Sequence, residues 1–419
     1  MYDVLVIGGG PAGIAAAVTA SNQSSVILVE RENRIGGILN QCIHEGFGLI
    51  KYGERLTGTE YAALAEKELN NSTVKVLSGA FITTIKRESE NIEDGFCIEY
   101  VNSDGVGQIK AKKIVLATGC RERTAKQIFV GGNNIAGILT AGTAQHYINL
   151  MGLMPTKRCI ILGSGDIGLI MARRLTLEGA TVLGVFEAKK EVGGLTRNVV
   201  QCLEDFNIPL YLQKTVTRVF GVDRVESVEV CSVDDNGTAI LESAERIDCD
   251  AVILSVGLIP ENEIAKKIGI KLCVKTKGPN VDQTLMTDEI GVYCCGNSLH
   301  VNDLVDYVSE SGYIAGGYAS SPLYPKDDCE VQIDDKFSYV VPQRINNYAP
   351  KCEVIFYLRV KQKMLNQSIS IWVNGLQHSV THYARLLPPE MIRIESDLSK
   401  YGKINDIKIK LEENRIKIS

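Results

Sequence analysis

Short apolar runs that end in glycine recur along the first part of the chain. The earliest, Tyr2–Ile7 (YDVLVI), leads into the glycine-rich turn Gly8–Gly13 (GGGPAG), and the alanine-rich stretch after it (AGIAAAVTA) is typical of a helix. A second apolar run, VILVE, then ends at Glu30. Because buried parallel strands are apolar throughout, this order predicts a strand, a glycine turn, a helix and a second parallel strand.

The same order recurs in the middle of the chain. Arg158–Gly163 (RCIILG) enters a second glycine-rich turn, Gly163–Gly168 (GSGDIG), which continues as the helical pattern DIGLIMARRLTLEG and returns as TVLGVFE, ending at Glu187. Two further apolar runs, Ile114–Gly119 and Ala251–Gly257, each follow one of these units and also end in glycine. The repetition predicts two Rossmann-type βαβ units in one chain.

The pattern changes beyond about residue 331, where short alternating or β-rich runs (CEVIFYLRV, SISIWVNG, IKIKLEENRIKIS) replace the strand–glycine–helix order. The pair Asn374-Gly375 is a turn signal, and no glycine-rich loop follows. We therefore expect a small C-terminal β domain, in which Trp372, His378 and His382 serve packing or lie on the surface. A domain without chemistry of its own is a candidate docking surface for a second copy or another subunit.

Composition adds limits on partners and location. The 419 residues are 45% hydrophobic with a formal net charge of −5, which is enough chain for two or three domains with apolar cores. Lys and Arg form no basic stripe, so nothing favours nucleic acid or an anionic membrane as a partner. No apolar run approaches the roughly 20 residues of a membrane span, and Met1 is followed at once by a strand without room for a cleaved leader. We expect a cytoplasmic protein.

The twelve cysteines are scattered and include no C-x-x-C pair. This spacing argues against a zinc ribbon, an iron–sulfur cluster or a thioredoxin-type dithiol, so no metal site is predicted. Most of these cysteines are expected to be small buried hydrophobes. Only Cys42 and the adjacent Cys294 and Cys295 lie beside a glycine motif.

Three glycines of the first turn have separate tasks in a dinucleotide site. Gly8 permits the tight turn, Gly10 lets the backbone approach a pyrophosphate, and Gly13 lets the helix pack on the strand. Glu30, at the end of the following strand, is placed to accept hydrogen bonds from a ribose diol.

The acid that closes the second unit bears on the choice of nicotinamide cofactor. Glu187 would repel a 2′-phosphate and bind a free 2′-hydroxyl, which favours NAD(H) over NADP(H). Lys189 and Lys190 follow it closely and act in the opposite direction.

With these motifs the chain resembles the pyridine nucleotide-disulphide oxidoreductase superfamily, flavoproteins with two dinucleotide-binding domains. The resemblance implies that the first turn binds FAD and the second binds NAD(H). The segments GGILNQCIH, ATGCRER, LTAGTAQ, GGLTRN, SVGLIPEN and VNDLVDYVSESG resemble one branch, the FAD/NAD-dependent oxidoreductases that accompany type 2 glycerol-3-phosphate dehydrogenase. More distantly, they resemble the flavin subunits of opine oxidase and hydrogen cyanide synthase. Gly296-Asn297 occupies the place where the superfamily has a Gly-Asp pair that touches the ribityl chain.

The resemblance also implies the architecture. We expect an α/β fold with two Rossmann-like domains of the glutathione-reductase type, the second inserted in the first, and a small C-terminal β domain. The FAD-binding domain would be discontinuous, comprising residues 1–122 and 275–325. The NAD(P)-binding domain would comprise residues 123–274, and residues 326–419 would form the β-rich domain for assembly or partner docking.

The residues of both cofactor sites follow from the same resemblance. For FAD they are Gly8, Gly10, Pro11, Ala12, Gly13, Glu30, Arg31, Gly37, Ile38, Leu39, Ala80, Phe81, Ala117, Thr118, Gly119, Gly296, Asn297, Val305 and Asp306. For NAD(H) they are Gly163, Gly165, Asp166, Ile167, Gly168, Glu187 and Gly257.

The segment Arg34–Gly48 (RIGGILNQCIHEGFG) departs from the disulfide-reducing members of the superfamily. Where those enzymes carry two redox cysteines, this chain has Leu39 and His44, and Cys42 between them has no resolving thiol in the segment. The resemblance therefore implies an enzyme without a redox-active disulfide, which passes electrons to an acceptor outside the chain. His44 and Cys42 are the candidate catalytic residues. His44 can modulate charge near a reduced flavin or relay a proton, or it can serve only to stabilise the loop.

Two classes of function remain open. The first is an electron-transfer subunit that exchanges electrons between NAD(H) and a protein partner, such as a glycerol-3-phosphate dehydrogenase. The second is a self-sufficient NADH oxidase or NADH:acceptor reductase. A binding protein with vestigial cofactor sites is a distant third. Oxidation of NADH by the purified chain in air, or only with a partner or dye, distinguishes the first two.

Overall fold

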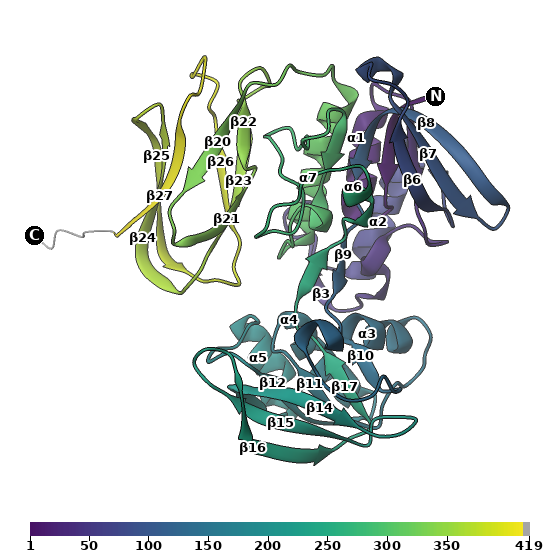
Figure 1. Cartoon of the computed structure of the whole chain (residues 1–419), viewed down its shortest axis with the longest axis vertical. Helices are drawn as coiled ribbons and strands as arrows, with labels where there is room; N and C mark the ends of the chain where they lie inside the picture. Colours follow the sequence, from purple (N-terminus) through teal and green to yellow (C-terminus); the bar gives the residue numbers. More distant parts are fainter. Residues whose placement is uncertain (414–419) are drawn as a thin grey trace, which may run out of the picture. The chain divides into compact units, whose positions relative to one another are not determined.

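The computed structural model of the chain describes residues 1–413 (Figure 1). The first apolar run forms a strand of a seven-stranded sheet with the order β5-β2-β1-β8-β7-β6, in which β19 also pairs with β8. The parallel strands of this sheet are β1 (Tyr2–Ile7), β2 (Val26–Val29), β5 (Lys75–Leu77), the end of β8 (Gly105–Leu116) and β19 (Val292–Cys294). Val4, Leu5 and Val6 are fully buried, so both faces of β1 are covered and the strand is apolar throughout.

Strand β8 takes part in two kinds of pairing because it is longer than its neighbours. Its last residues pair in parallel with β1 and β19, and its first residues pair antiparallel with β7 (Phe96–Asn102), which pairs with β6 (Phe81–Arg87). Ile7, Leu116 and Cys294 lie in register at the carboxyl ends of β1, β8 and β19. These ends therefore meet at one edge of the sheet, beside the first glycine turn.

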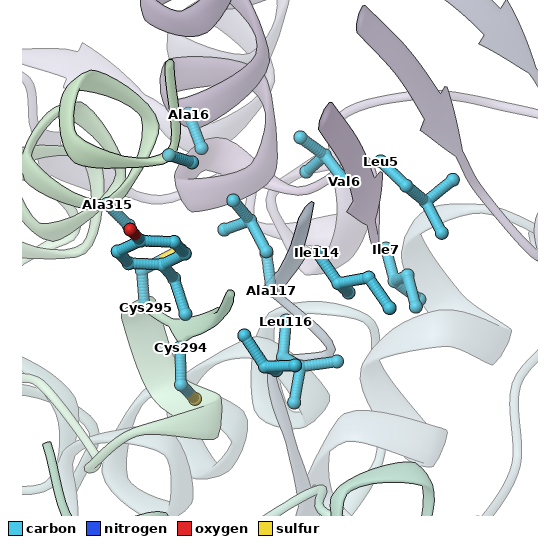
Figure 2. Packing of buried hydrophobic residues seen from close by; sticks show 14 of the residues in the cluster. Leu5, Val6, Ile7, Ala16, Ile114, Leu116, Ala117, Cys294, Cys295 and Ala315 are labelled. Carbon is cyan, nitrogen blue, oxygen red and sulfur yellow. The ribbon is translucent and has the colours of Figure 1, made fainter. Parts of the chain in front are cut away.

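Helix α1 (Pro11–Ser21) follows the first glycine turn and packs against α7 (Val305–Ser320). The two helix backbones approach closely because α7 has glycine at the contact, where a Cβ on Gly316 would overlap the carbonyl oxygen of Ala16. Figure 2 shows Ala16 of α1 and Cys294 of β19 in the core that these helices share with the sheet.

Between β2 and β5 the chain forms η1 (Gly37–Gln41), the two-stranded pair β3 (Glu45–Phe47) and β4 (Leu56–Thr57), and helix α2 (Gly58–Asn70). A capping box fixes the start of α2, since the Glu60 carboxylate accepts from the Thr57 N–H at 2.7 Å and the Thr57 hydroxyl accepts from the Glu60 N–H at 3.3 Å. Leu39 of η1 and Tyr61 of α2 are buried in one small apolar cluster.

The second βαβ unit forms a separate sheet of five parallel strands in the order β10-β17-β11-β12-β13. Its strands are β10 (Ile138–Thr140), β11 (Arg158–Leu162), β12 (Thr181–Glu187), β13 (Leu210–Leu212) and β17 (Ala251–Leu254), and its helices are α3 (Ala141–Asn149), α4 (Asp166–Leu177) and α5 (Thr196–Cys202). An antiparallel meander, β14 (Lys214–Phe220), β15 (Ser227–Val233) and β16 (Ala239–Asp248), lies between β13 and β17 in the chain.

The described chain divides into two packing units, residues 1–120 with 260–413 and residues 121–259. Short strands β9 (Cys120–Glu122) and β18 (Leu258–Pro260) carry the chain from one to the other. The sequence predicts an inserted domain that extends to residue 274, but the segment with α6 (Glu263–Lys267) packs in the first unit. The reason is that Ala265 and Ile270 are buried in that unit's core. The assignment of the units as FAD-binding and NAD-binding stays a prediction.

The C-terminal region forms two antiparallel or mixed sheets around a core of its own. One sheet contains β22 (Arg344–Asn346), β20 (Asp328–Ile333), β27 (Ile407–Glu413), β24 (Met364–Val373) and β25 (Leu376–Leu386), and the other contains β21 (Phe337–Val341), β23 (Val354–Val360) and β26 (Ile392–Ser396). The end of the strand expected over IKIKLEENRIKIS lies outside the described residues. The remaining short helices are η2 (Ile92–Asp94), η3 (Ala125–Ile128), η4 (Glu204–Phe206) and η5 (Gly296–Ser298).

Ion pairs and a hydrogen bond join the C-terminal β domain to α7 and to the segment before it. Arg393 of β26 contacts Glu310 of α7 at 2.7 Å, and Arg359 of β23 pairs with Asp303. Tyr357 of β23 donates a hydrogen bond to Glu310 and is buried in the core of the first unit. This domain is therefore part of the first unit's packing and not an appendage on a linker.

Candidate functional site

The first glycine turn has the shape that a dinucleotide pyrophosphate needs. Gly8 has a φ of 107°, and a Cβ there would overlap the carbonyl oxygen of Ala117. A Cβ on Gly13 would overlap the carbonyl oxygen of Gly8, so helix and strand touch only because this residue is glycine. Beside Gly10, in contrast, no atom lies within 4 Å of a Cβ position. The open side of Gly10, at the N-terminus of α1, fits a phosphate group.

Glu30 is held at the end of β2 by backbone donors. Its Oε2 accepts from the Gly9 N–H at 2.6 Å and its Oε1 from the Glu32 N–H at 2.8 Å, and only 7% of the residue is exposed. A carboxylate has about four lone-pair sites, so two remain for the hydroxyls of a ribose. The position therefore fits the adenosine end of FAD.

The second glycine turn repeats this geometry. A Cβ on Gly163 would overlap the carbonyl oxygen of Ser255, whereas the nearest atom to a Cβ on Gly165 is 3.9 Å away. Glu187 Oε2 accepts from the Ser164 N–H at 2.9 Å and from the Ser164 hydroxyl at 2.6 Å, and Oε1 accepts from the Lys189 N–H at 3.0 Å. The residues present therefore fit a second dinucleotide.

Of the two lysines that follow Glu187, Lys190 forms an ion pair that offsets its charge. Lys189 contributes a backbone N–H to Glu187, and Lys190 Nζ contacts Asp235 Oδ1 at 2.7 Å. Both side chains of the Lys190–Asp235 pair are exposed, so the pair adds little stability, but it offsets the charge of Lys190.

Other predicted FAD residues gather near the first turn. The Gly36 N–H donates to the Gly9 carbonyl at 2.8 Å, and a Cβ on Gly37 would lie 3.1 Å from Gly10 Cα. Ala80, buried beside the end of β2, donates its N–H to the Glu30 carbonyl at 3.0 Å. Ala117, Thr118 and Gly119 follow β8, and Gly296 and Asn297 follow β19, so the sheet brings them to the same edge.

Two of the predicted FAD residues, Asn297 and Asp306, have side chains that form hydrogen bonds with other parts of the protein. Asn297 Oδ1 accepts from the Asn302 N–H at 3.0 Å, and its Nδ2 donates to Cys120 Sγ at 3.6 Å. The buried Asp306 accepts from the Lys51 N–H at 2.8 Å and thereby holds the loop before α2 onto α7.

Others lie on the surface or serve packing. Arg31 is exposed and contacts Glu32, Ile38 and Phe81 are more than half exposed, and Val305 packs on the small cluster around Leu39. In the second unit Ile167 is 38% exposed, and Gly257, with a φ of 101°, follows β17.

The segment Arg34–Gly48 contains no nucleophile poised for disulfide chemistry. Leu39 is 3% exposed in its apolar cluster, and the ring of His44 lies 4.9 Å from that of Phe47, with Nδ1 3.3 Å from the Glu45 carbonyl oxygen. Cys42 Sγ contacts the Ile38 carbonyl oxygen at 3.4 Å, and burial raises the pKa of this thiol to about 12. At neutral pH Cys42 is therefore protonated.

Cys294 and Cys295, the other cysteines beside a glycine motif, are core residues. Figure 2 shows them near Leu116 and Ala117 in the core of the first unit. Burial raises the pKa of Cys294 to about 12 and that of Cys295 well above its ordinary value. Neither thiol is available as a thiolate.

Ser164 is a candidate site residue that sequence reasoning missed. It is fully buried, and its side chain links the Glu187 carboxylate to the N–H of Gly193, at 2.6 and 2.9 Å. The available signal was the contrast between the turns, GGGPAG and GSGDIG, in which serine replaces the second glycine.

Within residues 1–413, no group of three or more His, Cys, Asp and Glu side chains is arranged to hold a metal ion. No helix in this described part of the chain has the length and apolar character needed to cross a membrane.

Residues 2–312 match the family model for pyridine nucleotide-disulphide oxidoreductases. The chain belongs to this family. An opine oxidase subunit of Agrobacterium tumefaciens is 26% identical over 315 residues, which cover 71% of this chain and 61% of that protein. Hydrogen cyanide synthase subunit HcnB of Pseudomonas protegens is 23% identical over 293 residues, covering 64% of this chain and 59% of that protein. The chain thus matches less than two thirds of the length of either relative.

A solved structure supports the fold. The thioredoxin reductase of T. acidophilum superposes with a TM-score of 0.62 at 24% identity, over 76% of this chain and 97% of that one. The predicted α/β fold with two Rossmann-like domains and a C-terminal β region is therefore confirmed, as is the relationship to opine oxidase and hydrogen cyanide synthase subunits.

Membership of the family identifies the chain as an FAD-dependent oxidoreductase that uses FAD and NAD(P)H. The association with a type 2 glycerol-3-phosphate dehydrogenase and the absence of a redox-active disulfide stay predictions. So do the roles of the individual site residues.

Proposed function

We propose that the chain is the flavoprotein subunit of a larger oxidoreductase, in which it exchanges electrons between NAD(H) and an acceptor outside the chain. Bound FAD would supply the two-electron chemistry that links a hydride donor to that acceptor. Two relatives support a subunit role, because the opine oxidase and hydrogen cyanide synthase relatives are both named as subunits.

One observation carries the proposal: the segment Arg34–Gly48 offers no reactive pair of thiols. Leu39 is a core residue, His44 packs on Phe47, and the raised pKa of Cys42 keeps its thiol protonated at neutral pH. Thiol–disulfide exchange requires a thiolate, so Cys42 is a poor relay for electrons. We infer that the electrons leave the chain without passing through a disulfide.

The proposed roles of the chain's own residues follow from the two turns. Glu30 binds the ribose of FAD and the open side of Gly10 admits its pyrophosphate. Glu187 binds the adenosine ribose of NAD(H) and disfavours the 2′-phosphate of NADP(H), a preference that the Lys190–Asp235 pair supports. His44, half-buried between η1 and β3 in the segment Arg34–Gly48, is the proposed residue for moving a proton.

The proposed partner is a type 2 glycerol-3-phosphate dehydrogenase. The support is the resemblance of ATGCRER, GGLTRN and VNDLVDYVSESG to the flavoproteins that accompany such enzymes. The C-terminal β domain is the proposed docking surface, for this partner or for a second copy. A cytoplasmic location stays a prediction.

Purified FAD-loaded protein tests the proposal. NADH should reduce the bound flavin without oxygen, and turnover in air should be slow compared with turnover in the presence of a dye or the dehydrogenase. Fast and complete NADH oxidation in air by the chain alone would identify a self-sufficient NADH oxidase instead.

A further inference from the structure

The glycine pair that follows the first βαβ unit is repeated after the second. Arg34–Leu39 reads RIGGIL and Glu191–Thr196 reads EVGGLT, and each glycine pair stands at the same spacing from the acid that closes its unit, Glu30 or Glu187. The internal repeat therefore extends beyond the two glycine turns to the segment that comes after the ribose-binding acid.

In the first unit this segment lies directly on the glycine turn. The Gly36 N–H donates to the Gly9 carbonyl at 2.8 Å, and the Cα of Gly10 is 3.1 Å from a Cβ position on Gly37. The segment thus borders the open side of Gly10, where the pyrophosphate of FAD fits.

In the second unit the corresponding segment, Gly193–Asn198, lies in the same place. A Cβ on Gly193 would be 3.6 Å from the backbone nitrogen of Gly165, and one on Gly194 would be 3.0 Å from the carbonyl oxygen of Ser164. We call Gly193–Asn198 the clasp segment. Gly194 permits this approach, since a Cβ there would also lie only 2.9 Å from Asp166 Oδ1, whereas a Cβ on Gly193 would make ordinary contacts.

Two side chains of the second turn hold the clasp segment. Ser164 Oγ accepts from the Gly193 N–H at 2.9 Å while it donates to Glu187. Asp166 Oδ1 accepts from the Leu195 N–H at 2.8 Å and from Asn198 Nδ2 at 2.6 Å. The first turn has glycine and proline at the equivalent places, and there a backbone carbonyl holds the segment instead.

The hydrogen bonds of Asp166 bear on how a carboxylate can stand at a dinucleotide site. It is the first residue of α4, where a dinucleotide places its pyrophosphate, and a free carboxylate there would repel that anion. The two donors from the clasp segment turn Asp166 Oδ1 toward the segment and partly offset its charge. A carboxylate at this place is consistent with a role in the clasp.

We propose that the clasp segment forms one wall of the NAD(H) site, and that Ser164 and Asp166 are positioning residues that hold it against the second glycine turn. This inference rests on the proposed use of NAD(H) at that turn. Asp166, predicted from sequence as a cofactor-binding residue, then acts on the nucleotide through the backbone of the clasp segment.

The test compares Asp166→Ala with Asp166→Asn in the full-length, FAD-loaded protein, with NAD+ and NADH as the probes. Calorimetry or quenching of NADH fluorescence gives the dissociation constant, and anaerobic stopped-flow reduction gives the limiting rate. Asp166→Ala should raise the dissociation constant roughly tenfold with a much smaller change in limiting rate, because the wall is displaced while the flavin site is intact. Asp166→Asn keeps an oxygen that accepts both hydrogen bonds and should restore most of the affinity.

Ser164→Ala provides a second test, independent of the folding of the Asp166 variants. It removes the Oγ hydrogen bonds to both Gly193 and Glu187 and should also weaken NADH binding, with FAD content as in the parent. Unchanged NADH affinity in both Asp166→Ala and Ser164→Ala, in a parent that binds NADH, would overturn the clasp alone. Equal losses in Asp166→Asn and Asp166→Ala would mean that the carboxylate acts on the nucleotide directly. A folded, FAD-loaded parent that binds neither NADH nor NAD+ would overturn the proposed function as well.

Discussion

Glu187 closes the strand whose end, in a dinucleotide site, faces the adenosine ribose. Its carboxylate is fixed by Ser164 and Lys189 before any ligand binds, and about one of its four lone-pair sites is left, on Oε1, for a ribose hydroxyl. We predict that Glu187→Gln lowers the preference for NADH over NADPH by roughly tenfold, since hydrogen bonds to a charged group contribute about 1.5–3 kcal/mol. Anaerobic reduction of the flavin with each nucleotide measures the ratio. An unchanged ratio would show that Glu187 does not determine the preference, and equal or faster reduction by NADPH in the parent would mean that Lys189 and Lys190 dominate.

Cys42 and His44 lie in the same loop but in different surroundings. Since burial raises the pKa of Cys42 to about 12, its thiol is protonated from acid to mildly alkaline pH and contributes no thiolate to turnover. Cys42→Ser should therefore keep NADH:dye turnover within a few-fold, whereas His44→Ala should lower it, by up to roughly 100-fold if His44 moves a proton. Loss of turnover in Cys42→Ser with normal FAD content would contradict this assignment.

At the scale of elements, the close α1–α7 contact involves the helix that follows the first glycine turn. A Cβ on Gly316 would overlap the Ala16 carbonyl oxygen, whereas a Cβ on Gly317 would meet only Thr19 Cγ2 at 3.8 Å. We predict that Gly316→Ala destabilises the protein by about 1–3 kcal/mol and weakens FAD retention. Gly317→Ala is the matched control, with ordinary contacts and a small effect. Equal unfolding midpoints in urea for the two variants would contradict this account of the helix contact.

The segment after η5 contains a histidine that packs on the C-terminal β domain and should make stability depend on pH. His300 is 1% exposed between Tyr339 and Tyr357, and neither ring nitrogen has a hydrogen-bond partner among residues 1–413. Burial, with a smaller effect of Arg359, lowers the pKa of His300 to about 3. The unfolded chain therefore binds a proton at a higher pH than the folded chain, and stability falls as pH drops below about 6.5.

His300→Phe tests this dependence, because phenylalanine keeps a ring between the two tyrosines and removes the titrating group. The parent should lose unfolding free energy between about pH 7 and about pH 5, and the variant should lose less. Parallel curves for parent and variant would show that other groups account for the acid sensitivity.

At the scale of the whole molecule, the contacts of the C-terminal β domain with α7 bear on whether this domain can be removed by truncation. The sequence predicts that this domain serves assembly and takes no part in the chemistry, and its role in assembly stays a prediction. Arg359, Arg393 and Tyr357 of this domain bind the segment that contains α7. Removal of the domain would therefore expose Asp303 and Glu310 without their partners. Substitutions on the outer strands of the domain are therefore a better probe of docking than truncation.

Local patterns predicted the architecture well because they are short-range signals. The order of apolar strand, glycine turn and helix is contained in about 30 residues, and the tasks of Gly8 and Gly13 follow from backbone geometry alone. Side-chain partners could not be predicted in this way. Asp306 binds the backbone of Lys51 from a distant part of the chain, and Asn297 is turned to Asn302 and Cys120, pairings that only the folded sheet creates.

An anaerobic titration of the FAD-loaded protein with NADH tests the central claim most directly. If the chain has no redox-active disulfide, about one NADH per bound FAD should complete the reduction, because the flavin is the sole acceptor of two electrons. If a disulfide also takes electrons, about two NADH per FAD would be consumed and new thiols would react with an alkylating reagent. The first result would support an acceptor outside the chain, and the second would contradict it.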